Sequence, residues 1–307
     1  MESVKKRPRI GFRYLLDREG LLGPLMIAPA VGYVILLVGF PFLFALYLSA
    51  SNAISGGLNA SFVGLKNFIA VVHSPIFRQS LANTFIFTFV SQLLVLVLAN
   101  ILALTLVKSF PGKPLVRFLI LLPWAAPIVL GTLGWVWIFD STFSVINWML
   151  KTLGFLGSYG WLYWLGDTTL GMIAIITVHV WRMMPFATVI LLAGLTAIPQ
   201  DIIDATKVDG AGFWLRLFEI TIPLMLPIMV VAVLFGVVFT FTDMSVVYLL
   251  TRGGPFNSTH VLSSLAFQQG ILGGDLGQGA AIAVFLFPLL VVVAILMLRL
   301  ARRTEVV

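Results

Sequence analysis

Long apolar runs constrain this sequence more than any other feature. Four of them contain no formal charge, and each run is longer than the roughly 20 residues that cross a bilayer as a helix. The runs cover residues 21–48, 81–107, 118–139, 170–195, 222–250 and 276–298. Only 10% of all residues are charged, whereas soluble domains contain about a quarter. We therefore expect an all-α, polytopic membrane protein with six transmembrane helices in a lipid bilayer.

The basic residues between these runs predict which side of the membrane each segment faces. Residues 1–20 contain six basic residues and precede a run too long for a signal peptide, whose apolar core is about 7–15 residues. With six helices, the segments on the N-terminal side contain six, three, two and three basic residues, and the opposite segments contain four. Because Lys and Arg concentrate in cytoplasmic segments, we expect both termini in the cytoplasm.

One stretch decides whether this topology holds. Residues 140–169 mix Trp and Tyr with glycines and Lys151, and aromatic residues are enriched at membrane interfaces. We expect the stretch to lie along the outer surface. If it crossed the membrane instead, every later loop would change sides.

The residue inventory argues against several functional classes. The chain has no cysteine, which excludes thiolate catalysis, and its three histidines lie too far apart in sequence to indicate a metal site. We expect His179 to be a polar residue satisfied between helices. No G-x-x-x-x-G-K-[ST] phosphate loop and no clustered catalytic set is present, so we expect no enzyme. The net charge of +7 comes from the ends of apolar runs and does not indicate nucleic-acid binding.

Residues 199–223 form the longest charge-rich segment between two apolar runs. Gly210 and Gly212 interrupt its helical pattern, so we predict two short helices joined by a turn, with Pro223 in the first turn of the next helix. Apolar residues at i, i+1, i+4 and i+5 give the second short helix one apolar face. They are Phe213, Trp214, Leu217 and Phe218. An ordinary interfacial helix would show the same local pattern.

The spacing in this segment resembles a family motif. Asp204-Ala205-Thr206-x-x-x-Gly210, nine residues, then Ile220-x-Ile222-Pro223 is similar to the E-A-A-x-x-x-G-x9-I-x-L-P loop of ABC-importer membrane subunits. Three positions differ from the motif by residues of similar size or charge. In that family the loop is a cytoplasmic coupling helix seated in a groove of the ATPase subunit.

The resemblance implies a role for the residues of this loop. Asp204 would pair with basic groups of the ATPase, Gly210 would permit the turn, and three apolar side chains would fill the groove. The implied coupling residues are Asp204, Ala205, Thr206, Asp209, Gly210, Phe213, Trp214 and Leu217. ATPase closure would move these helices and switch a cavity from inward-facing to outward-facing.

Other segments resemble the carbohydrate-uptake branch of this family, over roughly residues 22–300. They are F-V-G-L-K-N-F at 62–68, in which Lys66 is a departure, Asn83-Thr84, W-R-x-x-P-F at 181–186 and T-R-G-G-P at 251–255. The resemblance implies the permease fold of a type I-like ABC importer in a bacterial or archaeal plasma membrane. Its parts would be a basic cytoplasmic segment at 1–20, a first transmembrane helix at 21–48 and a core of five helices at 81–300, which contains the coupling loop 199–223.

The resemblance also implies partners and a cargo class. The partners would be two cytoplasmic ABC ATPase subunits, which bind ATP and Mg, an extracytoplasmic solute-binding protein and a second permease subunit. We expect a heterodimer, although an identical second subunit fits the sequence too. This chain itself would bind no cofactor. The cargo would be a sugar or related solute, and oligosaccharide, polyol and glycerol phosphate all stay open.

Arg182 and Asp243 are the only formal charges within the apolar runs. An ionisable group in a membrane is costly unless it faces a bundle interior or a water-filled path. Both are therefore candidates for the solute path, together with Thr240 and Tyr248 of the fifth run. Arg182 has a structural alternative, in which it satisfies carbonyl groups freed by Pro185, and Tyr248 has another, as an interfacial anchor.

An ion-driven secondary transporter is the alternative function. Arg182 and Asp243 would then be the coupling pair. The sequence shows no inverted repeat, which many such transporters contain, and this function gives the loop at 199–223 no role.

Overall fold

The computed structural model describes residues 19–57, 60–157 and 159–304. Regular secondary structure in these residues is helical, apart from one isolated bridge between Ser51 and Phe62. The predicted basic segment at 1–20 lies almost entirely outside the described residues. Five helices are long and apolar enough to cross a membrane, or six if one bent pair counts as a single span. The all-α membrane fold is confirmed, and the predicted number of six spans is reached when the bent pair counts as one.

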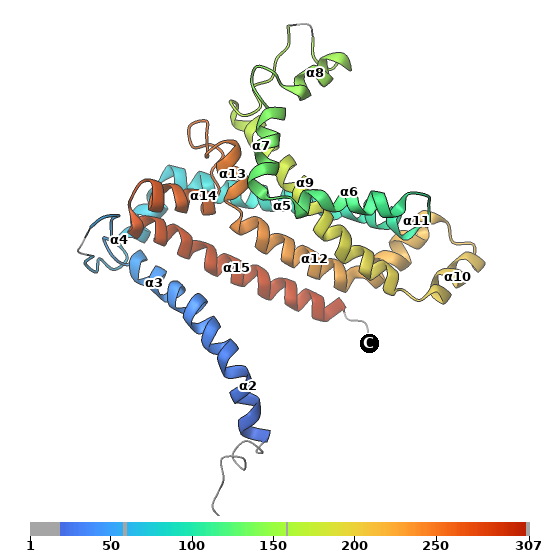
Figure 1. Ribbon diagram of the computed structural model, residues 1–307, viewed down its shortest axis with the longest axis horizontal. Coiled ribbons are helices and arrows are strands. Elements are labelled where there is room, and N and C mark those ends of the chain that lie inside the picture. Colours follow the sequence, from blue (N-terminus) through green and yellow to red (C-terminus); the bar gives the residue numbers. More distant parts are fainter. Residues whose placement is uncertain (1–18, 58–59, 158, 305–307) are drawn as a thin grey trace, which may run out of the picture.

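Four long helices form a lengthwise bundle (Figure 1). They are α5 (Pro75–Val107), α9 (Thr168–Ala197), α12 (Ile222–Thr242) and α15 (Leu276–Thr304). Helix α9 packs on α5 and α12, and α15 packs on α12. Small residues such as Ala99, Ala103 and Ala174 are fully buried in the core, while large apolar residues such as Phe89 face outward. An apolar outer surface around a core with small residues is what packing in lipid requires.

The third predicted span is not one straight helix. Helix α6 (Lys113–Ala125) and helix α7 (Ile128–Ile138) meet at an angle of 96°. Ala126 is extended at the break, as expected for a residue that precedes a proline. Helix α6 runs along α9, and α7 packs against the short helix α13 (Ser245–Leu250) at the far end of the bundle. The pair therefore runs from the C-terminal end of α5 to α13.

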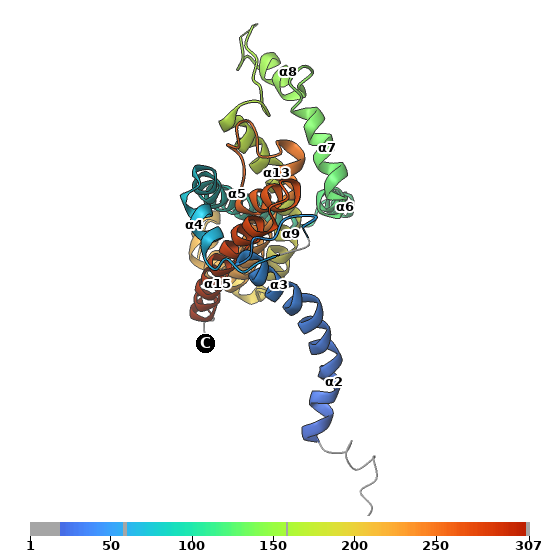
Figure 2. The same cartoon turned by 90° about the vertical axis from the view of Figure 1, so that its left-hand side faces the viewer.

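The first span projects away from the bundle, as Figures 1 and 2 show. It consists of α2 (Glu19–Val34), a π-helical turn η1 (Ile35–Gly39) and α3 (Phe40–Ser49). Its most apolar window has no buried residue, and only α3 packs against α15. Pro41 follows the π turn and has no N–H to donate to the carbonyl of Leu37, so the irregularity lies where one helical hydrogen bond is missing.

The end of the bundle near α3 is covered by short helices and loops. These are α4 (Lys66–His73), α14 (Leu262–Phe267) and the π turn η3 (Gln268–Leu272). Asn83 and Thr84 on α5 hold the covering loop, because Asn83 Nδ2 donates to the carbonyls of Ser258 and His260 and Thr84 Oγ1 accepts from the N–H of Leu262.

Residues 140–169 contain no candidate span in their described part. Helix α8 (Val145–Thr152) has eight residues, which is far short of the roughly 20 needed to cross a bilayer. It lies beyond α7, away from the bundle (Figure 2). The stretch therefore leaves the predicted number of membrane crossings unchanged.

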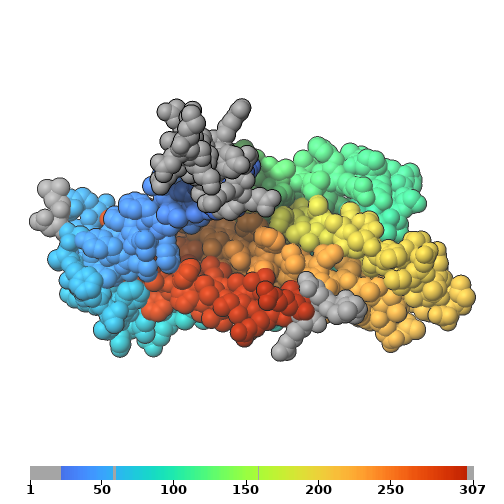
Figure 3. Space-filling model, turned by 90° about the horizontal axis from the view of Figure 1, so that it is seen from below, coloured from blue at the N-terminus to red at the C-terminus, as the bar shows by residue number. Residues whose placement is uncertain are grey.

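The opposite end of the bundle carries the loop at 199–223, shown in yellow and light orange in Figure 3. Helix α10 (Gln200–Val208) is the first predicted short helix. The second is not separate: α11 (Phe213–Arg216), the π turn η2 (Leu217–Thr221) and α12 form one helix, Phe213–Thr242. Pro223 lacks the N–H that would bond to Glu219, and the π turn accommodates this gap without ending the helix.

Candidate functional site

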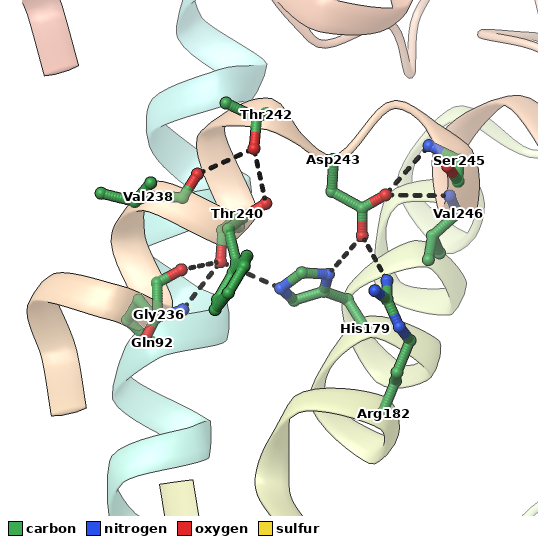
Figure 4. A network of polar contacts seen from close by, with 11 residues as sticks. Gln92, His179, Arg182, Gly236, Val238, Thr240, Thr242, Asp243, Ser245 and Val246 are labelled. Carbon is green, nitrogen blue, oxygen red and sulfur yellow. Dashed lines mark hydrogen bonds and ion pairs between the residues drawn. The ribbon is translucent and has the colours of Figure 1, made fainter. Parts of the chain in front are cut away.

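Five polar side chains from three elements converge inside the bundle (Figure 4). Asp243 Oδ2 accepts hydrogen bonds from His179 Nδ1 at 2.9 Å and from Arg182 Nη1 at 3.1 Å. His179 Nε2 lies 2.9 Å from Thr240 Oγ1, which also accepts from Gln92 Nε2 at 2.7 Å. We call Gln92, His179, Arg182, Thr240 and Asp243 the polar network. It connects α5, α9 and the end of α12.

Asp243 stands at a break that the sequence did not predict. The fifth run was expected to be one helix over 222–250, but α12 ends at Thr242 and α13 begins at Ser245. Asp243 has an extended backbone conformation, and its Oδ1 accepts from the N–H groups of Ser245 and Val246. One carboxylate therefore caps α13 with one oxygen and binds α9 with the other. The Oδ1 bonds satisfy two N–H groups at the start of α13.

The hydroxyl of Thr240 connects α12 to both neighbouring helices. Thr240 Oγ1 donates to the carbonyl of Gly236 at 2.7 Å and accepts from Gln92 Nε2 at 2.7 Å. It also lies 2.9 Å from His179 Nε2. Because His179 Nδ1 bonds to Asp243, the imidazole bridges Thr240 and Asp243.

The network is almost completely closed. His179 and Thr240 are fully buried, and the side chain of Asp243 is 6% exposed, whereas that of Arg182 is 25% exposed. A charged pair that is desolvated and hydrogen-bonded stabilises a structure only while both partners remain. Arg182 is therefore the more accessible partner of this ion pair, and Thr240 and Asp243 are closed off in this conformation.

Tyr248, the fourth predicted path residue, lies outside the network. It sits on α13 with its ring against Phe267, at 5.3 Å between centroids and 77° between planes. Arg182 forms an ion pair with Asp243. The partner of its guanidinium group is therefore this carboxylate and not the carbonyl groups freed by Pro185. The structure thus brings together three of the four predicted residues, and their role in a solute path stays a prediction.

Two members of the network were missed or undervalued in the sequence. His179 was expected only as a satisfied polar residue between helices, and it is that, but it also links Asp243 to Thr240. Gln92 was not singled out, although an amide in an uncharged run is itself a signal. Gly236 leaves room for this side chain, because a Cβ at position 236 would overlap the Gln92 amide.

Helix α10 presents the predicted coupling residues to solvent. The side chain of Asp204 is 57% exposed and accepts from Lys207 Nζ at 2.8 Å, which lowers the pKa of this carboxyl group. Ala205 and Asp209 are exposed, whereas Thr206 is buried and donates to the carbonyl of Ile203. Val208, which is not among the predicted coupling residues, is 87% exposed.

Gly210 ends α10 in the way its residue type suggests. Its φ of +74° lies in the left-handed region, and the N–H of Ala211 bonds to the carbonyl of Thr206. A glycine in this conformation followed by this 6→1 bond is the Schellman ending of a helix. The turn expected at Gly210 is confirmed by its geometry.

The apolar coupling residues have a different position from α10. Phe213, Trp214 and Leu217 lie on α11 and η2, where they line a cavity of about 640 Å³ together with the ends of α5 and α9. Their predicted contact with an ATPase stays a prediction. No group of three or more His, Asp or Glu that could hold a metal ion occurs among residues 19–57, 60–157 and 159–304.

Known proteins are similar to this chain in sequence. The model of the binding-protein-dependent transport system inner membrane component family matches residues 95–306. A trehalose/maltose transport system permease protein, MalF of Thermococcus litoralis, is 34% identical over 93% of this chain and 95% of its own. A sulfoquinovosyl glycerol transport system permease protein, SmoG of Agrobacterium fabrum, is 34% identical over 95% of this chain and 94% of its own.

The fold is also similar to that of a solved importer. A chain of a bacterial ABC transporter involved in the import of alginate superposes with a TM-score of 0.80 over 95% of this chain and 98% of its own, at 20% identity. Three observations lead to one family assignment. They are the long apolar helices, the loop at 199–223 and the family match over more than two thirds of the sequence. The chain belongs to the family of binding-protein-dependent transport system inner membrane components and is a multi-pass permease subunit of an ABC importer.

Proposed function

We propose that this permease carries a sugar or a sugar-like solute that an extracytoplasmic binding protein delivers. The relatives named for trehalose/maltose and for sulfoquinovosyl glycerol support a carbohydrate class. Arg182, the partly exposed member of the polar network, offers hydrogen-bond donors to hydroxyl or anionic groups of the solute. Oligosaccharides, polyols and glycerol phosphate all fit this description.

In this proposal, energy comes from two cytoplasmic ATPase subunits that bind ATP and Mg, and this chain binds no cofactor. A second permease subunit, different from this one, completes the path. Both termini and α10 face the cytoplasm. Ion-driven transport has less support, because the ion pair of Arg182 and Asp243 already has a structural role at the break between α12 and α13.

The continuous helix Phe213–Thr242 is the observation that carries the coupling mechanism. Its first residues follow α10 after the turn at Gly210, and its last residue precedes Asp243. Asp204, Ala205 and Val208 present an exposed surface of α10 to the ATPase. A displacement of α10 by ATPase closure is then transmitted through η2 and α12 to the polar network, where it changes how α12 and α13 meet α9.

Charge reversal on α10 tests this coupling. In the assembled importer in vesicles, Asp204→Lys should abolish solute uptake and solute-stimulated ATP hydrolysis, because it places a cation where we propose that the ATPase offers basic groups. Glu219→Lys, the same reversal on η2, is the matched control and should retain most of both activities. Membrane insertion should be equal in both variants. Normal uptake by Asp204→Lys would contradict the coupling role.

The solute class is tested on the binding protein that we propose delivers the cargo to this permease. Calorimetric titration with disaccharides, polyols and glycerol phosphate should give tight binding for one of these groups. Competition in vesicle uptake should follow the same order, because delivery selects the cargo. A binding protein that takes only amino acids or metal ions would overturn the proposed solute class and leave the permease assignment unchanged.

A further inference from the structure

The cavity between α10, α11 and the bundle has two chemically distinct parts. Its apolar wall includes Leu104, Leu195, Ile198, Phe213 and Leu217. Three basic residues, Lys108, Lys207 and Arg216, lie among its lining residues, which include no Asp or Glu in the described part of the chain. At about 640 Å³ the cavity has the size of a small-molecule site, roughly 300–1,000 Å³. An apolar wall with basic groups fits an amphiphile with an anionic head.

Two of these basic residues are available to a ligand. Lys207 is paired with Asp204 in α10. Within residues 19–57, 60–157 and 159–304, neither Lys108 nor Arg216 forms an ion pair with a carboxylate. Lys108 follows the last residue of α5, and Arg216 ends α11 on the adjacent wall. A cation left unpaired beside an apolar wall favours a negatively charged partner.

The depth of the cavity points to the lipid headgroup region. Candidate spans end at Val107 and Ala197 and begin at Phe213, and all three borders lie at this cavity. Ile101 and Trp214, which line it, are 55% and 67% exposed, so the cavity reaches the outer surface of the bundle. Basic pockets between transmembrane helices on the cytoplasmic side bind anionic lipid headgroups.

We propose that this cavity binds an anionic phospholipid of the cytoplasmic leaflet. Its phosphate lies between Lys108 and Arg216, and an acyl chain follows the apolar wall along α5 and α9. This placement rests on the proposed cytoplasmic position of α10. The lipid then fills the space between the coupling loop and the bundle, where it supports the position of α11 relative to the end of α5.

Quenching of Trp214 fluorescence by brominated lipids tests the site in the complete importer. Vesicles of phosphatidylcholine contain either brominated phosphatidylglycerol or brominated phosphatidylcholine at equal mole fraction. The difference between wild type and Trp214→Phe isolates the signal of Trp214 from the other tryptophans. We expect stronger quenching of Trp214 by brominated phosphatidylglycerol than by brominated phosphatidylcholine. Equal quenching by both lipids would overturn the proposal.

Substitution of the two unpaired basic side chains is a second test of the lipid site. Each basic side chain near an anionic surface strengthens binding about fivefold, so Lys108→Gln with Arg216→Gln should reduce the preference for phosphatidylglycerol by up to about 25-fold. Arg299→Gln with Arg302→Gln, a pair on α15 outside the cavity, is the control and should retain it. A preference that survives the loss of Lys108 and Arg216 would contradict the site.

Two further measurements distinguish a bound lipid from a soluble phosphate ligand, and the lipid proposal from the proposed function. Soluble glycerol phosphate in excess should not relieve the quenching, and full relief would indicate a free-phosphate site instead of a lipid site. Uptake is measured on the same vesicles. Wild-type vesicles that transport normally but show no lipid preference at Trp214 would overturn the lipid proposal alone, whereas vesicles without uptake would contradict the proposed function.

Discussion

The segments before and after the helix Phe213–Thr242 hold their charges in opposite ways. Before it, Asp204 and Lys207 of α10 pair on an exposed surface, where each side chain is more than half accessible. After it, Asp243 pairs with His179 and Arg182 in an almost closed interior. An exposed pair exchanges its partner for water or another protein at little cost, whereas a buried pair cannot lose one member cheaply.

This difference separates two kinds of function in the segments that flank one helix. The charges of α10 are free to meet a second protein, so their substitution should change coupling and leave the fold intact. The charges around Asp243 already satisfy each other and the start of α13, so their substitution should first change stability. Each variant below tests one side of this contrast.

The largest effect on stability is expected for Asp243→Ala. It removes the acceptor of Arg182 and His179 and the cap of α13, and breaking a buried pair costs about 3–5 kcal/mol. Thermal unfolding of the purified permease in detergent should show a large decrease in melting temperature. Thr242→Ala changes the exposed neighbour and should have little effect. Equal melting temperatures for the two variants would show that the buried charges do not hold α12 to α9.

A smaller loss is expected for Gly236→Ala. The added methyl group would overlap the Gln92 amide, and overpacking of a core typically costs about 1–3 kcal/mol. Gly134→Ala on α7 is the matched control, because no atom lies within 4 Å of a Cβ built there. It should be neutral or stabilising, since alanine favours helices. If both variants unfold at the wild-type temperature, the Gln92 contact does not constrain α12.

Gly210→Val should reduce uptake with a modest loss of stability. A side chain in the left-handed conformation costs roughly 1–2 kcal/mol, and the turn that orients α10 should deform. Gly212→Val is a close control, because a Cβ meets no atom within 4 Å at either glycine and Gly212 has a φ of −66°. Vesicle uptake should therefore be impaired only at position 210. Equal uptake by the two variants would contradict a role for this turn.

The smallest effect on stability is expected for Asp204→Asn. The lowered pKa of Asp204 means that its pairing stabilises the fold above the ordinary pKa of 3.8 and that this contribution is lost as pH falls through the lowered value. Because the pair is exposed, the melting temperature should match wild type from about pH 5 to pH 8, while solute-stimulated ATP hydrolysis declines. A clear drop in melting temperature would make Asp204 a structural residue.

Much of the fold and part of the site follow from local sequence patterns. Uncharged length predicts the spans, and the bend after Ala126 coincides with Pro127, a signal that was present but not used. Gly210 predicts its own turn, since few other residues adopt this conformation. These features depend on residues near each other in sequence, so a single sequence contains them.

The break at Asp243 could not be predicted in the same way. The run 222–250 is apolar on both sides of it, and the Asp243 side chain is held by His179 and Arg182, more than 60 positions away. The fusion of α11 to α12 was missed for a related reason. Pro223 favours a helix start, but the π turn before it allows one helix to continue.

Distance measurement between spin labels tests most directly whether α10 controls the polar network. The chain contains no cysteine, so Phe89→Cys on α5 and Thr242→Cys beside Asp243, both exposed positions, can be labelled selectively once the permease is purified and before it is assembled with its partners. In the assembled importer, a non-hydrolysable ATP analogue should shift the distance between the two labels, and Asp204→Lys should abolish this shift. A shift that persists in Asp204→Lys, or that is absent in the wild type, would contradict coupling through this helix.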